Sequence, residues 1–174
     1  MRPRTAPGPQ TAEVRRRCQS FAKLLEPFNV TVLAYDKFKF GFAKGYIKEA
    51  GMEQICRYAD VISFHVPLTK ETMEMANAGF FTSLASRPYI LNTSRGKVIN
   101  LDDLTVALQE NKIAGAGLDV LPKEPLAQYT DQEKEKLSLL LSLPNVIITP
   151  HIAGYTHEAS YKMAETVLQK LRIG

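Results

Sequence analysis

The chain alternates short apolar runs with longer segments whose apolar residues recur at helical spacing, and this alternation constrains the fold more than any other feature. Strands that alternate with helices are joined by right-handed crossovers and build a parallel sheet with helices on both faces. The sequence therefore predicts an α/β protein with a doubly wound parallel sheet. The expected strands are Val30–Tyr35, Ala59–Phe64, Tyr89–Leu91, Ile113–Leu118 and Val146–Thr149.

Polar residues at defined positions mark the beginnings of two expected helices. Asn100 is an N-cap residue with Asp103 three positions on, and Thr130 followed by Glu133 has the form of a capping box. These residues predict helices that begin at Asn100 and at Thr130. Further helices are expected over Val14–Pro27, Lys48–Tyr58, Glu71–Leu84 and a C-terminal segment with Met163, Val167 and Leu171 on one face, whereas Phe38–Tyr46 is expected to be a loop.

Length and composition are typical of a soluble globular protein. The 174 residues, 45% of them hydrophobic and 23% charged, suffice for one domain with a core. No apolar run approaches the length of a membrane span, and Cys18 and Cys56 indicate neither a disulfide framework nor a metal site. We therefore expect a cytoplasmic protein without a bound metal or a membrane partner.

The positive charge of the chain is concentrated near its N-terminus. The formal net charge is +4, and residues 1–17 contain five arginines. Basic arms can contact nucleic acid, but no nucleic-acid motif or interleaved aromatic residue accompanies this one. Residues 1–13 are also rich in proline and show no helical or strand periodicity. They are predicted to be a disordered basic tail, and we expect no nucleic-acid partner.

Each expected strand is followed by a residue with a functional side chain. These residues are Asp36, His65, Arg95, Asp119 and His151. A single aspartate at such a position is often an ordinary turn residue, but five strand ends in succession are harder to assign to turns. In parallel α/β sheets, ligands bind beyond the carboxyl ends of the strands. The sequence therefore predicts a binding site along that edge.

The residue types at this edge suggest a particular chemistry. Arg95, followed by Gly96, can hold a substrate carboxylate in a bidentate pair, with a surface salt bridge as the alternative. His151 can transfer a proton near neutral pH, and Glu124 can accept its ring N–H and fix the tautomer. Asp36 either forms a turn or takes the hydroxyls of an adenosine ribose. Together these groups describe hydride transfer to a 2-keto acid.

Three motifs give the chain a resemblance to a known family. They are Asn92-Thr93-Ser94-Arg95-Gly96, Gly117-Leu118-Asp119-Val120 with Glu124-Pro125, and Thr149-Pro150-His151-Ile152-Ala153-Gly154. In this order and spacing they resemble the signatures of the D-isomer-specific 2-hydroxyacid dehydrogenases, a family that includes D-3-phosphoglycerate dehydrogenase. The resemblance extends from about Val14 to Leu171 and implies a Rossmann-type NAD-binding domain.

The resemblance also implies an activity and roles for individual residues. The activity is that of an NAD-dependent oxidoreductase acting on the CH–OH group of a D-2-hydroxy acid or, in reverse, reducing a 2-keto acid. Arg95 would bind the substrate carboxylate, His151 would be the acid–base catalyst and Glu124 would pair with it. Asp36 would hold the adenosine ribose and Asp119 the nicotinamide amide. The remaining cofactor-binding residues that the resemblance implies are His65, Val66, Pro67, Thr93, Ser94 and Gly154, together with Arg95 and His151.

The choice between NAD and NADP depends on the residues around Asp36. A 2′-phosphate on the ribose would meet the negative charge of this aspartate, which favours NAD. Lys37 and Lys39 follow directly and carry the opposite charge. NAD is the expected cofactor, and the two lysines leave NADP as the alternative.

The chain departs from the family pattern before the first expected helix. The expected first strand and Gly-x-Gly-x-x-Gly turn are missing, and Arg15 stands where the last glycine belongs. Gly115–Val120 is a similar string, but it leads into Pro122 and not into a helix. In the strand order 3-2-1-4-5-6 the first strand is central. We therefore expect Val30–Tyr35 and Tyr89–Leu91 to lack their shared neighbour.

The separate substrate domain of the family is missing as well. Residues 14–174 are therefore predicted to form a partial NAD-binding domain, N-terminally truncated and with weak or no activity alone. The alternative is a non-enzymatic, NAD(H)-responsive interaction module, as in the transcriptional corepressors that share these motifs. The complete set of Arg95, Glu124 and His151 favours an enzyme. A homodimer is expected in either case, because the family commonly dimerises through this domain.

Overall fold

A computed structural model describes residues 18–171 of the chain. The predicted basic tail, residues 1–13, and the predicted helix start at Val14 lie outside the described residues. The described part contains two parallel sheets, one with four strands and one with two. The α/β class and the parallel sheet that the sequence predicts are confirmed.

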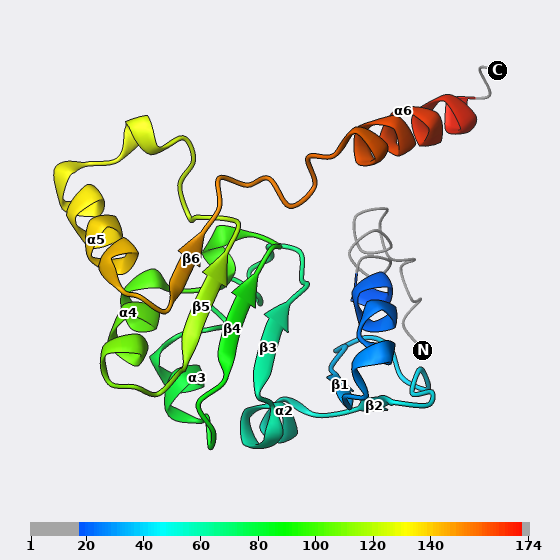
Figure 1. The fold of residues 1–174 in the computed structure, drawn as a ribbon, viewed down its shortest axis with the longest axis horizontal. Coiled ribbons are helices and arrows are strands. Elements are labelled where there is room, and N and C mark those ends of the chain that lie inside the picture. The colour runs from blue at the N-terminus through cyan, green and yellow to red at the C-terminus, as the bar shows by residue number, and fades with distance from the viewer. Residues whose placement is uncertain (1–17, 172–174) are drawn as a thin grey trace.

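The larger sheet brings the carboxyl ends of its strands to one edge. Its strands are, in spatial order, β3 (Val61–Phe64), β4 (Tyr89–Asn92), β5 (Gly115–Leu118) and β6 (Val146–Ile148). Every neighbouring pair is parallel, and Ile90 in β4 is in register with Ile62 in β3 and with Ala116 in β5. The four arrows in Figure 1 accordingly point the same way, so the segments that follow them share one end of the sheet.

Helices pack against this sheet around a common apolar core. They are α2 (Met52–Tyr58), α3 (Ala78–Thr82), α4 (Leu101–Gln109) and α5 (Asp131–Ser142). The core joins Ile90 of β4 with Phe81 of α3, Leu104 of α4 and Leu140 of α5, and each of these side chains is at most 2% exposed. Burial of large apolar side chains from all of these elements holds the strand ends in fixed relative positions.

The two helix starts that the sequence predicts are confirmed. The Asn100 side chain accepts a hydrogen bond from the Asp103 backbone N–H at the start of α4. At the start of α5, the Thr130 hydroxyl accepts from the Glu133 N–H, and the Glu133 carboxylate accepts from the Thr130 N–H. These contacts satisfy backbone donors that the first turn of a helix leaves unpaired.

The smaller sheet belongs to a separate N-terminal unit. A helix over residues 18–24 and the 3-10 turn η1 (Glu26–Phe28) precede β1 (Val32–Ala34), which pairs in parallel with β2 (Ile47–Glu49). Figure 1 shows this unit beside β3, at the opposite end of the larger sheet from β6. Among the described residues no strand lies between β1 and β3, so the sheet is divided at this point.

The predicted helix over Lys48–Tyr58 is wrong at its beginning. Residues Ile47–Glu49 form β2, and α2 begins only after Gly51, which is its N-cap. The strand is held by long-range pairing with β1, including hydrogen bonds from Val32 N to Tyr46 O (2.9 Å) and from Ala50 N to Ala34 O (3.0 Å). The sequence of β2, Ile47-Lys48-Glu49, has a single apolar residue and no apolar run, so its pairing with β1 decides its conformation.

Tyr89–Leu91 forms a strand as predicted, but the prediction that this strand lacks a neighbour is wrong. That segment lies inside β4, which pairs with β3 on one side and β5 on the other. The strand that faces the division opposite β1 is β3, Val61–Phe64. The error follows from the missed β2. Without it, Tyr89–Leu91 is counted as the fourth strand of the family's order, although Val61–Phe64 occupies that place.

Two further segments differ from or extend the predicted helices. Only Ala78–Thr82 of the predicted helix Glu71–Leu84 is helical, because Asn77 caps it and residues 69–75 turn through hydrogen bonds of Thr69 and Thr72. The C-terminal helix is present as α6 (His157–Leu171), which extends away from the sheet with no buried residue. No helix among residues 18–171 has the length and apolar character needed to cross a membrane.

Candidate active site

Three loops that follow β4, β5 and β6 meet at the carboxyl edge of the larger sheet. They bring Arg95, Glu124 and His151 around one open cavity of about 250 Å³. Each of the three side chains comes from a different strand end, as the topology of a parallel sheet predicts. The full lining is Leu68, Arg95, Gly96, Lys97, Val120, Leu121, Pro122, Glu124 and His151. A cavity of this size accommodates a small organic acid.

His151 is held by a direct contact with Glu124. The Nδ1 atom of the ring lies 2.9 Å from Glu124 Oε2, and Glu124 Oε1 accepts a hydrogen bond from the Leu121 N–H at 3.1 Å. The hydrogen bond with His151, followed by the one from Leu121, holds the pKa of Glu124 below its usual range. Glu124 therefore stays ionised and orients the ring, which leaves Nε2 as the second ring nitrogen available for proton transfer.

The lowered pKa of Glu124 predicts a pH-dependent contribution to stability. A carboxyl group with a depressed folded-state pKa stabilises the fold above its unfolded pKa, and this contribution is lost as the pH falls through the folded value. We expect the chain to be more stable than its Glu124→Gln variant at neutral pH, and the difference to shrink below pH 4.5, the ordinary value for this group. Urea unfolding midpoints of both proteins across the acid range test this, and a constant difference down to low pH would contradict it.

Asp119 anchors the loop that carries His151. Its carboxylate is 5% exposed and accepts three hydrogen bonds, from Thr149 Oγ1 (2.5 Å), Ile152 N (2.9 Å) and Ala153 N (2.9 Å). Burial by itself raises the pKa of Asp119, but these hydrogen bonds outweigh it and hold the pKa below the usual range. Contacts on both sides of His151 fix its backbone in the left-handed region, at φ 54°. Asp119 thus positions the histidine without touching it.

An Asp119→Asn substitution should weaken this anchor. An amide keeps one acceptor oxygen, so it can still accept from Thr149 and Ile152 but faces the Ala153 N–H with a donor. We expect the free energy of unfolding to fall by about 1–3 kcal/mol, the usual range when a buried donor loses its partner. Urea denaturation measures it. The matched control is Asp60→Asn at an exposed position, which should change stability by no more than about 0.5 kcal/mol.

The loop that carries Arg95 is organised by Asn92. The Asn92 side chain is 1% exposed, donates to Arg95 O (3.0 Å) and accepts from Ser94 N (3.0 Å) and Ser94 Oγ (2.8 Å). The Arg95 guanidinium donates from Nη1 to Ser94 O at 2.6 Å, and Arg95 is exposed and lines the cavity. Asn92 opens the motif that contains Arg95, but nothing else in the sequence marks it as a structural determinant.

Gly96 brings the Arg95 loop into contact with the Glu124 loop. It begins the 3-10 turn η2 (Gly96–Val98), and a Cβ atom there would lie 2.0 Å from the backbone C of Leu121 and 2.4 Å from Pro122 N. The backbone after β4 therefore touches the backbone after β5 directly. Only glycine permits this approach, and it sets the spacing between Arg95 and the Glu124–His151 pair.

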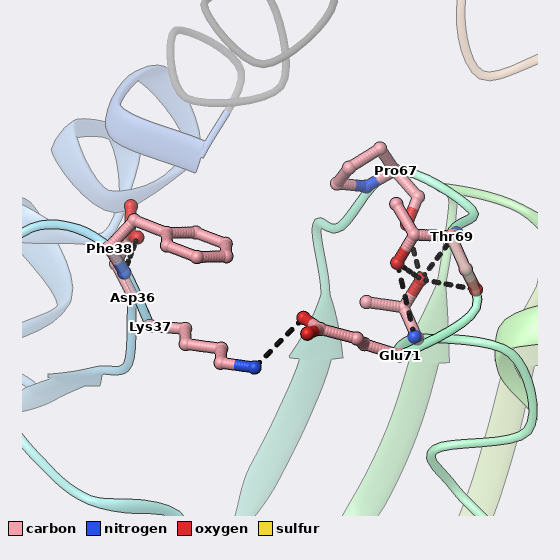
Figure 2. Close-up of polar contacts among 7 residues, drawn as sticks. Asp36, Lys37, Phe38, Pro67, Thr69 and Glu71 are labelled. Atoms are coloured by element: carbon pink, nitrogen blue, oxygen red, sulfur yellow. Dashed lines mark hydrogen bonds and ion pairs between the residues drawn. The ribbon is translucent and has the colours of Figure 1, made fainter. Parts of the chain in front are cut away.

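The predicted cofactor residues follow the carboxyl ends of strands in both sheets. Asp36 follows β1, and its Oδ1 accepts hydrogen bonds from Phe38 N (2.9 Å) and Lys39 N (3.1 Å). His65, Val66 and Pro67 follow β3, and Thr93 and Ser94 follow β4. Gly154 lies beyond β6, where a Cβ atom would meet nothing within 4 Å. Figure 2 shows Asp36 and Pro67 on opposite sides of the division between the two sheets.

His65 is suited to a lining role and not to proton transfer. Burial lowers its pKa, so the ring is neutral near pH 7. Its Nε2 lies 2.9 Å from Ser63 Oγ, and the ring contacts Phe21 at a centroid distance of 5.5 Å. These contacts connect the N-terminal unit to the end of β3.

The side chains at this edge of the sheets suit the two ends of a dinucleotide. A carboxylate at the end of β1 suits ribose hydroxyls, and the cavity beside His151 is where a nicotinamide and an acid substrate would meet. Residues 115–118 form the strand β5, so the Gly115–Val120 string is not a phosphate-binding turn. Within residues 18–171, no group of histidine, cysteine and acidic side chains is placed to hold a metal ion.

Related proteins share this fold and these motifs. D-3-phosphoglycerate dehydrogenase 1 of Saccharomyces cerevisiae is 38% identical over 141 residues, which are 78% of this chain and 30% of the yeast protein. The glyoxylate reductase of Pyrococcus furiosus is 38% identical over 158 residues, which are 88% of this chain and 44% of that enzyme. The chain thus spans less than half the length of these curated relatives.

Solved structures and a family model agree with these relatives. The NAD-complexed D-isomer-specific 2-hydroxyacid dehydrogenase of Lactobacillus delbrueckii matches with a TM-score of 0.78 and 30% identity, over 87% of this chain and 48% of that one. The D-lactate dehydrogenase of Aquifex aeolicus, complexed with NAD and lactic acid, matches with a TM-score of 0.78 and 33% identity, over 88% and 49%. The model of the D-isomer-specific 2-hydroxyacid dehydrogenase NAD-binding domain matches residues 16–153. The chain therefore belongs to the D-isomer-specific 2-hydroxyacid dehydrogenase family, whose NAD-binding domain it matches.

Proposed function

We propose that this chain binds NAD and takes part in hydride transfer between the cofactor and a D-2-hydroxy or 2-keto acid. The observation that carries the proposal is the convergence of Arg95, Glu124 and His151 on one cavity from three strand ends. A non-enzymatic interaction module does not need this combination of side chains. The relatives named above include enzymes that act on different small acids, so the proposal names the substrate class and no single acid.

The roles of the three residues follow from their chemistry. The Arg95 guanidinium, at the edge of the cavity, holds the substrate carboxylate in a charge-assisted pair. His151, oriented through Nδ1 by Glu124, donates a proton from Nε2 to the keto oxygen during reduction and accepts it during oxidation. The nicotinamide, when bound, supplies or accepts the hydride. Asp36 would hold the adenosine ribose and Asp119 the nicotinamide amide, while Asp119 also keeps the His151 loop in place.

A titration of the chain with NADH tests the cofactor part of the proposal. The chain contains no tryptophan, so the fluorescence of the bound nicotinamide is free of tryptophan emission. We expect saturable binding that is lost in Asp36→Ala. Addition of a 2-keto acid should then oxidise NADH slowly, and Arg95→Gln should abolish this oxidation while it weakens NADH binding far less than Asp36→Ala does.

The same experiment separates the enzyme from the alternative. Saturable NADH binding without oxidation of NADH by any 2-keto acid, and with no effect of Arg95→Gln, would contradict the proposed reaction and favour an NAD(H)-responsive interaction module. Absence of NADH binding by the folded chain would contradict the cofactor assignment itself. The homodimer and the cytoplasmic location that the sequence suggests stay predictions, and sedimentation of the chain tests the first of them.

A further inference from the structure

We propose that Glu71 is a specificity-determining residue for the cofactor, because it holds the Lys37 ammonium group and so keeps the adenosine-ribose site at Asp36 selective for NAD over NADP. The inference rests on the proposed function, since it concerns the cofactor of that reaction. In the sequence, the two lysines beside Asp36 leave the preference open. The structure adds a carboxylate that no local pattern places there.

The first step is the contact between Lys37 and Glu71. Lys37 Nζ lies 2.9 Å from Glu71 Oε2, although the two residues lie in loops that follow strands of different sheets. Figure 2 shows Lys37 reaching from the segment after β1 to Glu71 in the loop after β3, with Phe38 and Asp36 above it. The pair spans the division between the two sheets, on the same side as the proposed ribose-binding carboxylate.

The loop that carries Glu71 is braced by its own hydrogen bonds. Thr72 Oγ1 donates to Pro67 O at 2.6 Å, and Thr69 N donates to Thr72 Oγ1 at 2.8 Å. Figure 2 shows Pro67 and Thr69 next to Glu71 in this braced turn. Glu71 is thus presented from a fixed backbone, which lowers the entropy that the ion pair must overcome.

The second lysine also has a partner within the chain. The Lys39 ammonium group lies 6.0 Å from the centre of the Phe42 ring, and the Lys39 backbone N–H donates to Asp36 Oδ1. The turn at Asp36 therefore fixes its carboxylate at the end of β1 and directs the two lysines to separate partners.

The balance of charge at this site decides which ribose it favours. The formal charges of Asp36, Lys37 and Lys39 alone sum to +1, which suits a 2′-phosphate of about −1.5 to −2. When Glu71 is included, the four formal charges sum to zero, and Lys37 is already paired with Glu71. A 2′-phosphate would meet two carboxylates and would have to displace Glu71 from Lys37, whereas a 2′-hydroxyl needs only the Asp36 acceptor.

Titrations with NADH and NADPH test this inference, because the two cofactors differ only in the 2′-phosphate. The wild-type chain should bind NADH more tightly than NADPH. Glu71→Gln should tighten NADPH binding by about 3–10-fold at low salt and less at high salt, as expected for one charge near the surface. NADH binding should change by less than about twofold. Adding Lys37→Met to Glu71→Gln should remove the gain for NADPH.

A matched control separates this effect from a change in net charge. Glu135→Gln removes the same charge from α5, which Figure 1 shows at the opposite end of the larger sheet from β1, and should leave both affinities unchanged. Intact NADH binding with no gain for NADPH in Glu71→Gln would overturn the inference alone. Absence of binding of either cofactor by every protein would overturn the proposed function and this inference together.

Discussion

Replacing Gly96 by alanine is expected to lower the free energy of unfolding by about 3 kcal/mol or more, at the upper end of the usual cost of overpacking. The added methyl would lie 2.0 Å from Leu121 C, 2.1 Å from Leu121 O and 2.4 Å from Pro122 N. All three are backbone atoms, so no side chain can rotate away to make room. Relief requires the loops after β4 and β5 to separate, which also moves Arg95 away from Glu124. Urea denaturation and NADH oxidation with a 2-keto acid measure the two consequences.

The control for this substitution is Gly154→Ala. Gly154 lies in the loop after β6, and a Cβ atom there would meet nothing within 4 Å. Its stability should stay within about 0.5 kcal/mol of the wild-type value. An equally small effect at Gly96 would show that the two loops do not touch as described.

The second large effect is expected for His151→Gln. Glutamine retains hydrogen-bonding groups but cannot donate and recover a proton near neutral pH, so the rate of 2-keto acid reduction should fall by about 10²–10⁴-fold. The His151 ring pairs with Glu124 through Nδ1 and lines the cavity. NADH binding should weaken far less than the rate falls, because Asp36 and the segments after β3 and β4 are unchanged. The rate of NADH oxidation at saturating cofactor measures the effect.

His157 provides a matched control for the histidine substitution. It is exposed at the start of α6 and does not line the cavity, so His157→Gln should leave the rate unchanged. General acid–base catalysis contributes about 10²–10⁴-fold to a rate. If the rate in His151→Gln falls by less than about tenfold, another group transfers the proton.

The spacing of apolar residues and the capping residues at helix starts predict most of the regular structure of the chain. The runs around Ile62, Ile90, Ala116 and Ile147 form the four strands of the larger sheet. Helices α4 and α5 begin where Asn100 and Thr130 predict. These predictions succeed because burial of apolar side chains and capping of helix ends depend on residues that are close together in the sequence.

The site could be predicted only in part. The sequence predicts that Arg95 and His151 lie at one edge and that Glu124 accepts from the histidine, because parallel strands bring their ends together and the motifs resemble those of a known family. The contact of Asp119 with both sides of the His151 loop is not foreseen, although Asp119 itself is a candidate. Asn92 and Thr149 give no signal apart from their place in the motifs.

The features that the tertiary structure alone decides are contacts between segments distant in the chain. β2 exists because β1 pairs with it, and the sheet is divided between β1 and β3, not beside β4. Gly96 is required by the Leu121 backbone, and Lys37 is held by Glu71. Local sequence predicts which residues are buried and where elements begin, because these depend on neighbouring residues. It does not predict which distant backbones or charges meet, because that depends on how the packed elements place their loops in space.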